Sequence, residues 1–93
     1  MSVRAKFKVT RIEATEGCKQ TGVNEQGRPT YERCELRTIV LTPVYQNGDP
    51  NHENNIFWQA SPSGEIRLGT INPAAWEQFE LGAEFYIDFT RAL

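Results

Sequence analysis

Eight residues near the N-terminus, Val3 to Thr10, alternate strictly between apolar and basic or polar side chains. The even positions of this segment include three cations: Arg4, Lys6 and Lys8. A period of two is that of a β-strand with one buried face, so the segment predicts a strand with cations about 7 Å apart on its outer face. The alternation changes phase at Ile12 and Ala14, which predicts a β-bulge near Thr10-Arg11 or the end of the strand pairing there.

Four more segments carry strand patterns, and one carries a helix pattern. The strand segments are Tyr31–Tyr45, Ile56–Ala60, Glu65–Gly69 and Glu84–Thr90. In the last of them apolar residues occupy every second position, which is the plainest strand signal in the chain. The segment Asn72–Phe79 begins with a helix-capping asparagine followed by proline, and Gly82 follows its end. It therefore predicts a helix of two turns or fewer.

Polar segments separate these elements. Residues 16–30 carry three glycines and a proline, which is the composition of a long loop or a loose hairpin. Residues 46–55 are nearly all turn formers and predict a surface loop. The tetrapeptide Ser61-Pro62-Ser63-Gly64 predicts a tight turn that joins two of the short strands into a hairpin.

The order of these elements predicts the fold class. Four strands, one short helix and a last strand indicate a mainly β protein, a small five-stranded and partly open β-barrel. This order is that of SH3-like barrels, and the alternative is an OB-like barrel, in which the helix follows the third strand. The length of 93 residues is that of one domain, so we expect a single β-barrel domain over residues 1–93.

Charge and hydropathy exclude some classes of protein. The chain has 10 Lys and Arg against 12 Asp and Glu, and this excludes a general polyanion binder, which carries a strong basic excess. The cations are concentrated in the first half, so this half either presents an anion-facing surface or is neutralised by the second half. No segment is apolar enough to span a membrane and no signal-peptide pattern occurs, so we expect a soluble, unexported protein with no membrane partner.

Nucleophile and metal-ligand patterns are missing from the sequence. Cys18 and Cys34 are too far apart for a redox pair and do not have the spacing of a zinc site. The single histidine, His52, lies among turn formers, and no pattern around it would position a catalytic base. We therefore expect no enzyme activity, no catalytic residue, no metal and no cofactor.

The first candidate binding surface is a row of cations. If the second long strand pairs beside the first, five cations share one face: Arg4, Lys6, Lys8, Arg33 and Arg37. Such a cluster could bind phosphate, because arginine offers a planar fork of donors and lysine a point charge. The alternative is an ordinary solvated sheet face on which glutamates offset the cations, with Glu13, Glu32 and Glu35 as candidates.

The second candidate surface is aromatic. Tyr45, Phe57, Trp58 and Trp76 are more than one small barrel interior easily accommodates. Phe57 and Trp58 are adjacent, so on a regular strand they face opposite ways and only one enters the core. The other meets solvent, a ligand or another subunit. The alternatives are a stacking platform for a nucleobase and a homo-oligomer interface.

Several segments resemble a known group of proteins. They are Arg4-Ala5-Lys6-Phe7, Pro43-Val44-Tyr45, Glu53-Asn54, the run from Phe57 to Gly64, Asn72-Pro73-Ala74 and the run from Phe79 to Thr90. This pattern resembles small, mostly uncharacterised proteins of tailed bacteriophages, over most of the chain except residues 15–35. The resemblance implies a phage protein acting in the cytoplasm of the host bacterium, and it supplies no active site.

The resemblance and the two surfaces lead to a functional expectation. We expect a non-enzymatic, homo-oligomeric phage protein that sequesters a nucleotide-like immune signal as an anti-defence factor. The expected phosphate-binding residues are Lys6, Lys8, Arg33, Arg37 and Arg67; the stacking residues are Tyr45 and Trp58; the amide donors and acceptors are Asn54 and Asn55. The alternatives are a single-stranded DNA-binding accessory protein and a protein–protein inhibitor or virion component that binds a host protein.

Overall fold

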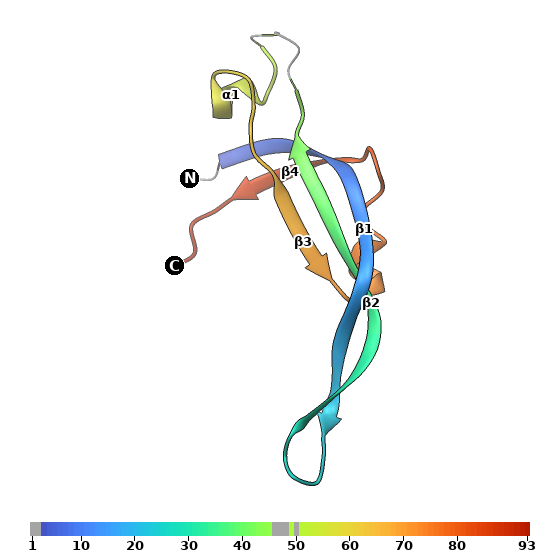
Figure 1. Ribbon diagram of the computed structural model, residues 1–93. Helices are drawn as coiled ribbons and strands as arrows, with labels where there is room; N and C mark the ends of the chain where they lie inside the picture. The colour runs from blue at the N-terminus through green and yellow to red at the C-terminus, as the bar shows by residue number, and fades with distance from the viewer. Residues whose placement is uncertain (1–2, 46–48, 50) are drawn as a thin grey trace.

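The strands form one antiparallel sheet (Figure 1). A computed structural model describes residues 3–45, 49 and 51–93. The elements are β1 (Val3–Val23), β2 (Pro29–Pro43), α1 (Asn55–Trp58), β3 (Ile66–Thr70), α2 (Pro73–Trp76) and β4 (Glu84–Phe89). The strand order in the sheet is β3-β2-β1-β4. Each neighbouring pair is antiparallel, and β3 and β4 are the two edges.

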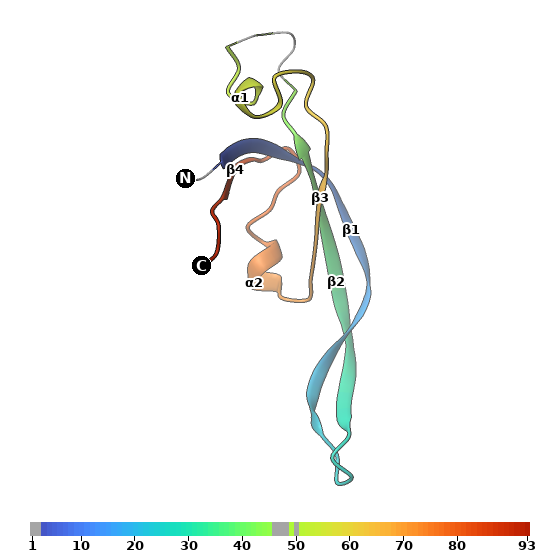
Figure 2. The ribbon, with the colours of Figure 1, turned by 90° about the vertical axis from the view of Figure 1, so that its left-hand side faces the viewer.

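The β1–β2 hairpin is much longer than the rest of the sheet. Neither β3 nor β4 pairs with residues 15–36, which we call the arm, and the arm extends away from the other elements (Figures 1 and 2). The turn at its end is closed by the Asn24 side chain, whose Oδ1 accepts hydrogen bonds from the backbone amides of Gln26 and Arg28. The segment of residues 16–30 is therefore a hairpin, the second of the two alternatives that its composition predicted.

The predicted phase change in β1 is confirmed as a bulge. The pairing with β2 shifts register between Val9 and Arg11. Because of this shift, Val9 and Ile12 both face the core side of the sheet although they are three positions apart. The bulge also allows the strand to bend, and in Figure 2 β1 curves away from β2 toward β4.

One face of the sheet carries the core. Five residues of β1 and β2 form a buried cluster: Ala5, Phe7, Val9, Ile39 and Leu41. Phe85 and Ile87 of β4, Ile66 of β3 and Trp76 of α2 pack against this cluster and are partly buried. We call this side the concave face. Its other side, the outer face, carries the cations of β1. The cluster is small because, among the residues that the structure describes, only two short helices are available to cover it.

The structure confirms a mainly β fold with little helix, and it differs from a five-stranded barrel. The sheet has four strands and is not closed. The segment Ile56–Ala60, predicted as a strand, lies largely in α1, where the backbone amides of Phe57 and Trp58 donate to the carbonyl of Asn54. The turn at Ser61–Gly64 therefore joins a helix to β3, and the prediction of a hairpin there is wrong. The predicted helix at Asn72 is confirmed as α2, with the Asn72 side chain accepting from the amide of Ala74.

Two further predictions concern chain segments outside the sheet. The surface loop predicted for residues 46–55 lies partly outside the described residues, and its last residue begins α1. In the part of the chain that the structure describes, no helix is long and apolar enough to cross a membrane.

We predict that the core depends on Leu41 far more than on an exposed leucine. Leu41 is 2% exposed and Leu81 is 66% exposed. Leu41→Ala should lower the free energy of unfolding by about 2–4 kcal/mol, because it removes buried methyl groups and leaves a cavity. Leu81→Ala should change it by less than about 0.5 kcal/mol. Urea unfolding followed by tryptophan fluorescence measures both, and equal effects would contradict this assignment of the core.

Candidate interaction site

Asn54 holds the end of the sheet together. Its side chain is 1% exposed and lies beside the backbone of β1. The Asn54 Oδ1 atom accepts from the amide of Lys6 at 2.7 Å, and Nδ2 donates to the carbonyls of Lys6 and Val44, each at 2.9 Å. One amide side chain thus satisfies backbone groups of two segments, as a neighbouring strand would. Asn54 was predicted as a ligand-binding amide, and its side chain is instead fully occupied within the chain.

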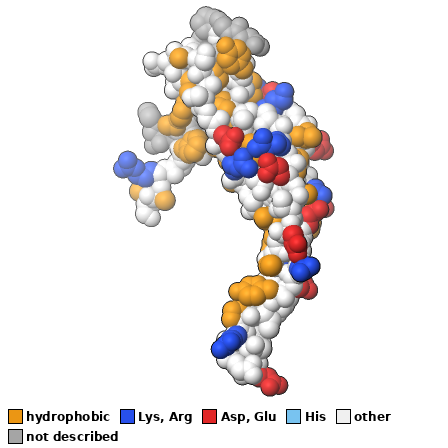
Figure 3. Space-filling model, in the orientation of Figure 1, with side chains coloured by type: hydrophobic (Ala, Val, Ile, Leu, Met, Phe, Trp, Pro, Cys, Tyr) orange, Lys and Arg blue, Asp and Glu red, His pale blue; other side chains and the backbone are white. Residues whose placement is uncertain are grey.

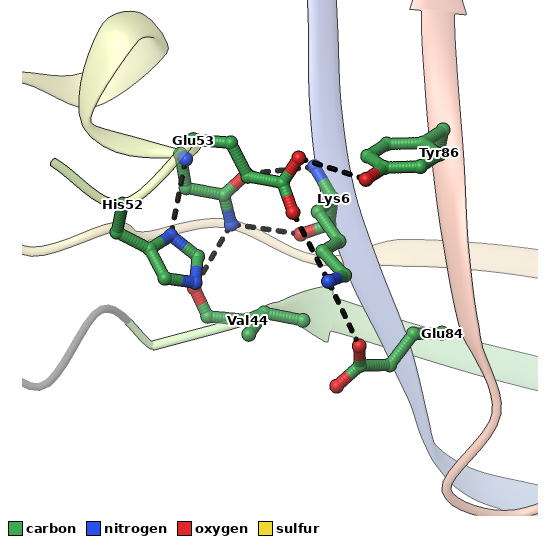
Figure 4. Close-up of polar contacts among 7 residues, drawn as sticks. Lys6, Val44, His52, Glu53, Glu84 and Tyr86 are labelled. Carbon is green, nitrogen blue, oxygen red and sulfur yellow. Dashed lines mark hydrogen bonds and ion pairs between the residues drawn. The ribbon is translucent and has the colours of Figure 1, made fainter.

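Lys6 lies at the centre of an ion-pair cluster on the outer face (Figure 4). Its Nζ atom is 3.0 Å from Glu53 Oε1 and 3.1 Å from Glu84 Oε1. The hydroxyl of Tyr86 donates to Glu53 Oε2 at 2.8 Å. The register explains this arrangement, since Lys6 is opposite Tyr86 and its neighbour Lys8 is opposite Glu84. The cation of Lys6 is therefore neutralised by two carboxylates.

The pKa values in this cluster follow from these hydrogen bonds. Bonds from Tyr86 and Lys6 lower the pKa of Glu53, and the bond to Glu53 raises the pKa of Tyr86. Bonds to Glu53 and Glu84 raise the pKa of Lys6 well above its ordinary value. Beside the cluster, Arg4 lies over the Tyr86 ring and its bond to Asp88 lowers the pKa of that carboxyl. Each shift favours the ion-paired forms, and none prepares a base or an acid for catalysis near neutral pH.

Three other cations predicted to bind phosphate also have partners within the chain. Arg33 Nε is 2.9 Å from Glu16, and Arg37 Nε is 2.9 Å from Glu35. Arg67 contacts both Glu65 and Glu13. Lys8 is exposed on β1. In Figure 3, Lys and Arg side chains alternate with Asp and Glu along the visible face. Apart from Lys8, these cations are therefore offset by glutamates of the chain, as the alternative that the sequence offered had it.

Arg37 does not join the row of Lys6 and Lys8. Lys8 is opposite Thr42, so even-numbered residues of β2 share its face, and the odd-numbered Arg37 faces the concave side. There its guanidinium lies 4.6 Å from the centre of the Trp76 ring. The sequence did not fix this pairing register, and the expectation of one shared cationic face, which included Arg33 and Arg37, is wrong.

The predicted stacking and amide residues are also separated. Tyr45 is exposed just beyond the end of β2. Trp58 ends α1, its indole Nε1 donates to the Ser63 carbonyl at 3.0 Å, and its ring packs against Phe7 and Phe57. Asn55 is half-buried at the start of α1. The structure therefore brings Lys6 and Asn54 together, near α1, and leaves Arg33, Arg37 and Arg67 on other parts of the sheet.

Sequence reasoning missed an apolar groove on the concave face. A cavity of about 510 Å³ on the concave face is lined by Leu41, Ile66, Leu68, Phe79, residues 85–87 and Phe89. Most of these residues come from the two edge strands, β3 and β4, whereas Leu41 belongs to β2 and Phe79 follows α2. Leu68 is 47% exposed and Phe89 is 51% exposed. The strict alternation of Phe85, Ile87 and Phe89 could have indicated this groove, had the sheet been known to stay open.

A second cavity, of about 480 Å³, lies between α1 and the start of β1. Its walls include Val3, Ile56 and Phe57, and the Lys6–Glu53 pair lies at its margin. Ile56 is 84% exposed and Phe57 is 46% exposed. Exposed apolar side chains therefore occur at the end of the sheet as well as along the groove.

Comparison with known proteins gives one distant match. The chain is 28% identical over 72 residues to the yeast protein "Altered inheritance of mitochondria protein 24, mitochondrial" of Lodderomyces elongisporus. The match covers 75% of this chain and about 15% of that protein's length. No family model matches the chain. No solved structure matches it either.

This comparison corrects the expectations that rested on the phage resemblance. The relative is a yeast mitochondrial protein, so the expected phage origin and the bacterial cytoplasmic location are wrong. The anti-defence function falls with them, as do the alternatives tied to that origin, and neither the match nor the ion-paired cations support nucleotide binding. The residues that carried the resemblance are mainly turn and core residues, such as Gly64 and Phe85, and these specify local structure without specifying origin.

We predict that Asn54→Ala destabilises the fold strongly. The substitution leaves the amide of Lys6 and the carbonyl of Val44 without this partner in a partly buried place, while the carbonyl of Lys6 keeps only its bond from the amide of Val44. The expected loss is about 3 kcal/mol or more, since each unsatisfied buried group costs about 1–3 kcal/mol. Asn51, which is exposed, supplies the matched control, and Asn51→Ala should change stability by less than about 0.5 kcal/mol. Chemical denaturation of both variants tests this, and similar midpoints would refute the role of Asn54.

We also predict an acid-sensitive contribution from Glu53. Because its pKa is lowered in the folded chain, its stabilising effect is complete above the ordinary value of 4.5 and is lost as the pH falls through the lower folded value. Wild-type stability should therefore decrease between about pH 5 and pH 2, and the decrease should be smaller in Glu53→Gln. Glu25→Gln, in the exposed turn of the arm, is the control and should keep the wild-type profile. Thermal melts across this pH range measure it.

Proposed function

We propose that this chain is a non-enzymatic protein-interaction module that binds an extended polypeptide segment in the apolar groove. The observation that supports this most directly is the cavity of about 510 Å³ lined by apolar and aromatic side chains of both edge strands. Exposed apolar patches of this kind mark interaction surfaces on small soluble domains. A segment with apolar residues at every second position would fill the groove with one of its faces.

The edges of the sheet support an extended partner in particular. β3 and β4 each pair on one side only, so each has backbone amides and carbonyls directed away from the sheet. A partner strand that adds to such an edge gains main-chain hydrogen bonds and places alternate side chains on the apolar face. Helical partners would fill the groove without satisfying these backbone groups.

The polar residues support a binding role without catalysis. The only fully buried polar side chain among the described residues is Asn54, and its hydrogen-bonding atoms are occupied by backbone groups. Lys6, Glu53 and Tyr86 bind each other. A catalytic site requires a positioned acid, base or nucleophile that can reach a substrate, and these groups are engaged in holding the sheet and α1 together.

The proposal predicts which variant abolishes peptide binding. A displayed library of nine-residue peptides with apolar residues at alternate positions should yield binders to the wild-type chain. Leu68→Glu should weaken them by about tenfold or more, because it places a carboxylate in the groove at a site that is already half exposed. Val23→Glu, at the exposed end of the arm, should leave their affinity within about twofold.

Biolayer interferometry of the selected peptides measures these affinities. Circular dichroism establishes that both variants remain folded. Peptides that bind equally to the wild-type chain and Leu68→Glu, or a library that yields no binders, would refute the proposed function.

A further inference from the structure

We propose that the strand added at this site is β4 of a second copy of this chain, paired antiparallel to β4 with Ile87 opposite Ile87. The inference rests on the proposed function and names its partner. Pairing the two β4 strands would join the two four-stranded sheets into one continuous sheet of about eight strands, with the two concave faces side by side.

The large exposed surface area of the single chain supports association with a second copy. The chain exposes 7022 Å², whereas a folded monomer of 10.6 kDa exposes roughly 5,500 Å². Its radius of gyration is 18.0 Å, against roughly 12 Å for a compact domain of this length. The excess is about 1,500 Å², part of it on the arm, and a standard interface covers about 800 Å² on each partner. One standard interface between copies would therefore cover about half of this excess surface.

The concave face of β4 is self-complementary in the proposed register. Phe85, Ile87 and Phe89 all face the concave side, because they pair with Phe7, Ala5 and Val3 of β1. An antiparallel pair centred on Ile87 places Phe85 of each copy opposite Phe89 of the other. Apolar and aromatic residues directly opposite one another are the favourable cross-strand pairs of a sheet. The half-exposed Phe89 then gains a neighbour that it lacks in the single chain.

The charges of the outer face select this register over its neighbour. Centring the pair on Ile87 places Tyr86 opposite Asp88, so that a phenol meets a carboxylate. Centring it on Tyr86 would place Glu84 opposite Asp88, and like charges directly opposite each other are destabilising. Arg4 and Lys6 ion-pair with Asp88 and Glu84 within the chain, and in the register centred on Ile87 no acid of one copy lies opposite an acid of the other. Symmetric antiparallel pairing allows only registers that are centred on a residue. Of the registers centred on Ile87 and on Tyr86, the one centred on Ile87 avoids the repulsion between Glu84 and Asp88.

The other edge of the sheet is less suited to this pairing. β3 has two apolar residues on the concave side, Ile66 and Leu68, and it contains Gly69, which offers no side chain to a partner. β4 has three apolar residues there and carries no proline, lysine or bulge, the features that protect an edge strand from pairing. The β4 edge is therefore the one that the sequence leaves open to a second copy.

Single cysteines test both the partner and the register. In a Cys18→Ser, Cys34→Ser background, Ile87→Cys should form a disulfide-linked dimer under mild oxidation, because opposite Cα atoms lie about 4.5–5.5 Å apart and a disulfide spans this distance. Tyr86→Cys should not, because the two Cα atoms would then lie about 8 Å apart. Cross-linking at Tyr86→Cys and not at Ile87→Cys would overturn the register. The absence of cross-linking at both positions would overturn the β4 pairing.

Sedimentation of chains without engineered cysteines gives an independent test. The wild-type chain should sediment as a dimer, and Phe89→Lys should raise the dimer dissociation constant by about tenfold or more, because the ammonium would face Phe85 of the other copy. Leu81→Lys, in the exposed loop before β4, is the matched control and should change it by less than about twofold. A wild-type chain that sediments as a monomer would overturn this inference. If the same monomer still bound library peptides in a manner sensitive to Leu68→Glu, the proposed function would stand, so the two failures are distinguishable.

Discussion

An open sheet edge is the constraint on which the rest of this molecule depends. The four strands leave β3 and β4 unpaired on one side, and the fifth segment with strand patterning, Ile56–Ala60, lies largely in α1. A closed barrel would satisfy those backbone groups and enclose the apolar side chains, but the segment between β2 and β3 forms α1 and cannot supply a fifth strand. The concave face is thus partly covered by α2 and partly exposed as the apolar groove.

The loss of the fifth strand has a local cause in Asn54. Its side chain occupies the backbone groups of Lys6 and Val44 that a strand at this end of the sheet would need, and its own carbonyl starts α1. A side-chain amide can do this because it carries both a donor and an acceptor, as a peptide unit does. The same interaction places Glu53 against Lys6, so the ion-pair cluster of the outer face also follows from the position of Asn54.

The predictable part of this fold came from alternation, and the rest required tertiary information. The Val3–Thr10 and Glu84–Thr90 patterns, the bulge after Val9 and the capped α2 follow from the sequence because local side-chain periods determine them. The run Ile56–Ala60 is too short for its period to distinguish strand from helix, and the contact with Asn54 decides it. The parts of β1 and β2 that form the arm lack an apolar face. Contacts such as that of Arg33 with Glu16 join them, and the periodicity of the sequence does not indicate these contacts.

Part of the candidate site could likewise be recognised from the sequence, and part became visible only in the structure. The difference shows which surface is available to a partner. Lys6 and Asn54 were recognisable as polar residues of interest, but their partners Glu53, Glu84 and Tyr86 became visible only with the register. An anion that approached Lys6 would have to displace two carboxylates, and exchanging one solvent-exposed ion pair for another gains little free energy. Covering Leu68 or Phe89 removes apolar area from water and gains about 25 cal/mol for each Å² covered, with nothing to displace except water. The free energy available for binding therefore lies on the concave face and at the β4 edge, while the charged outer face is already satisfied by its own carboxylates.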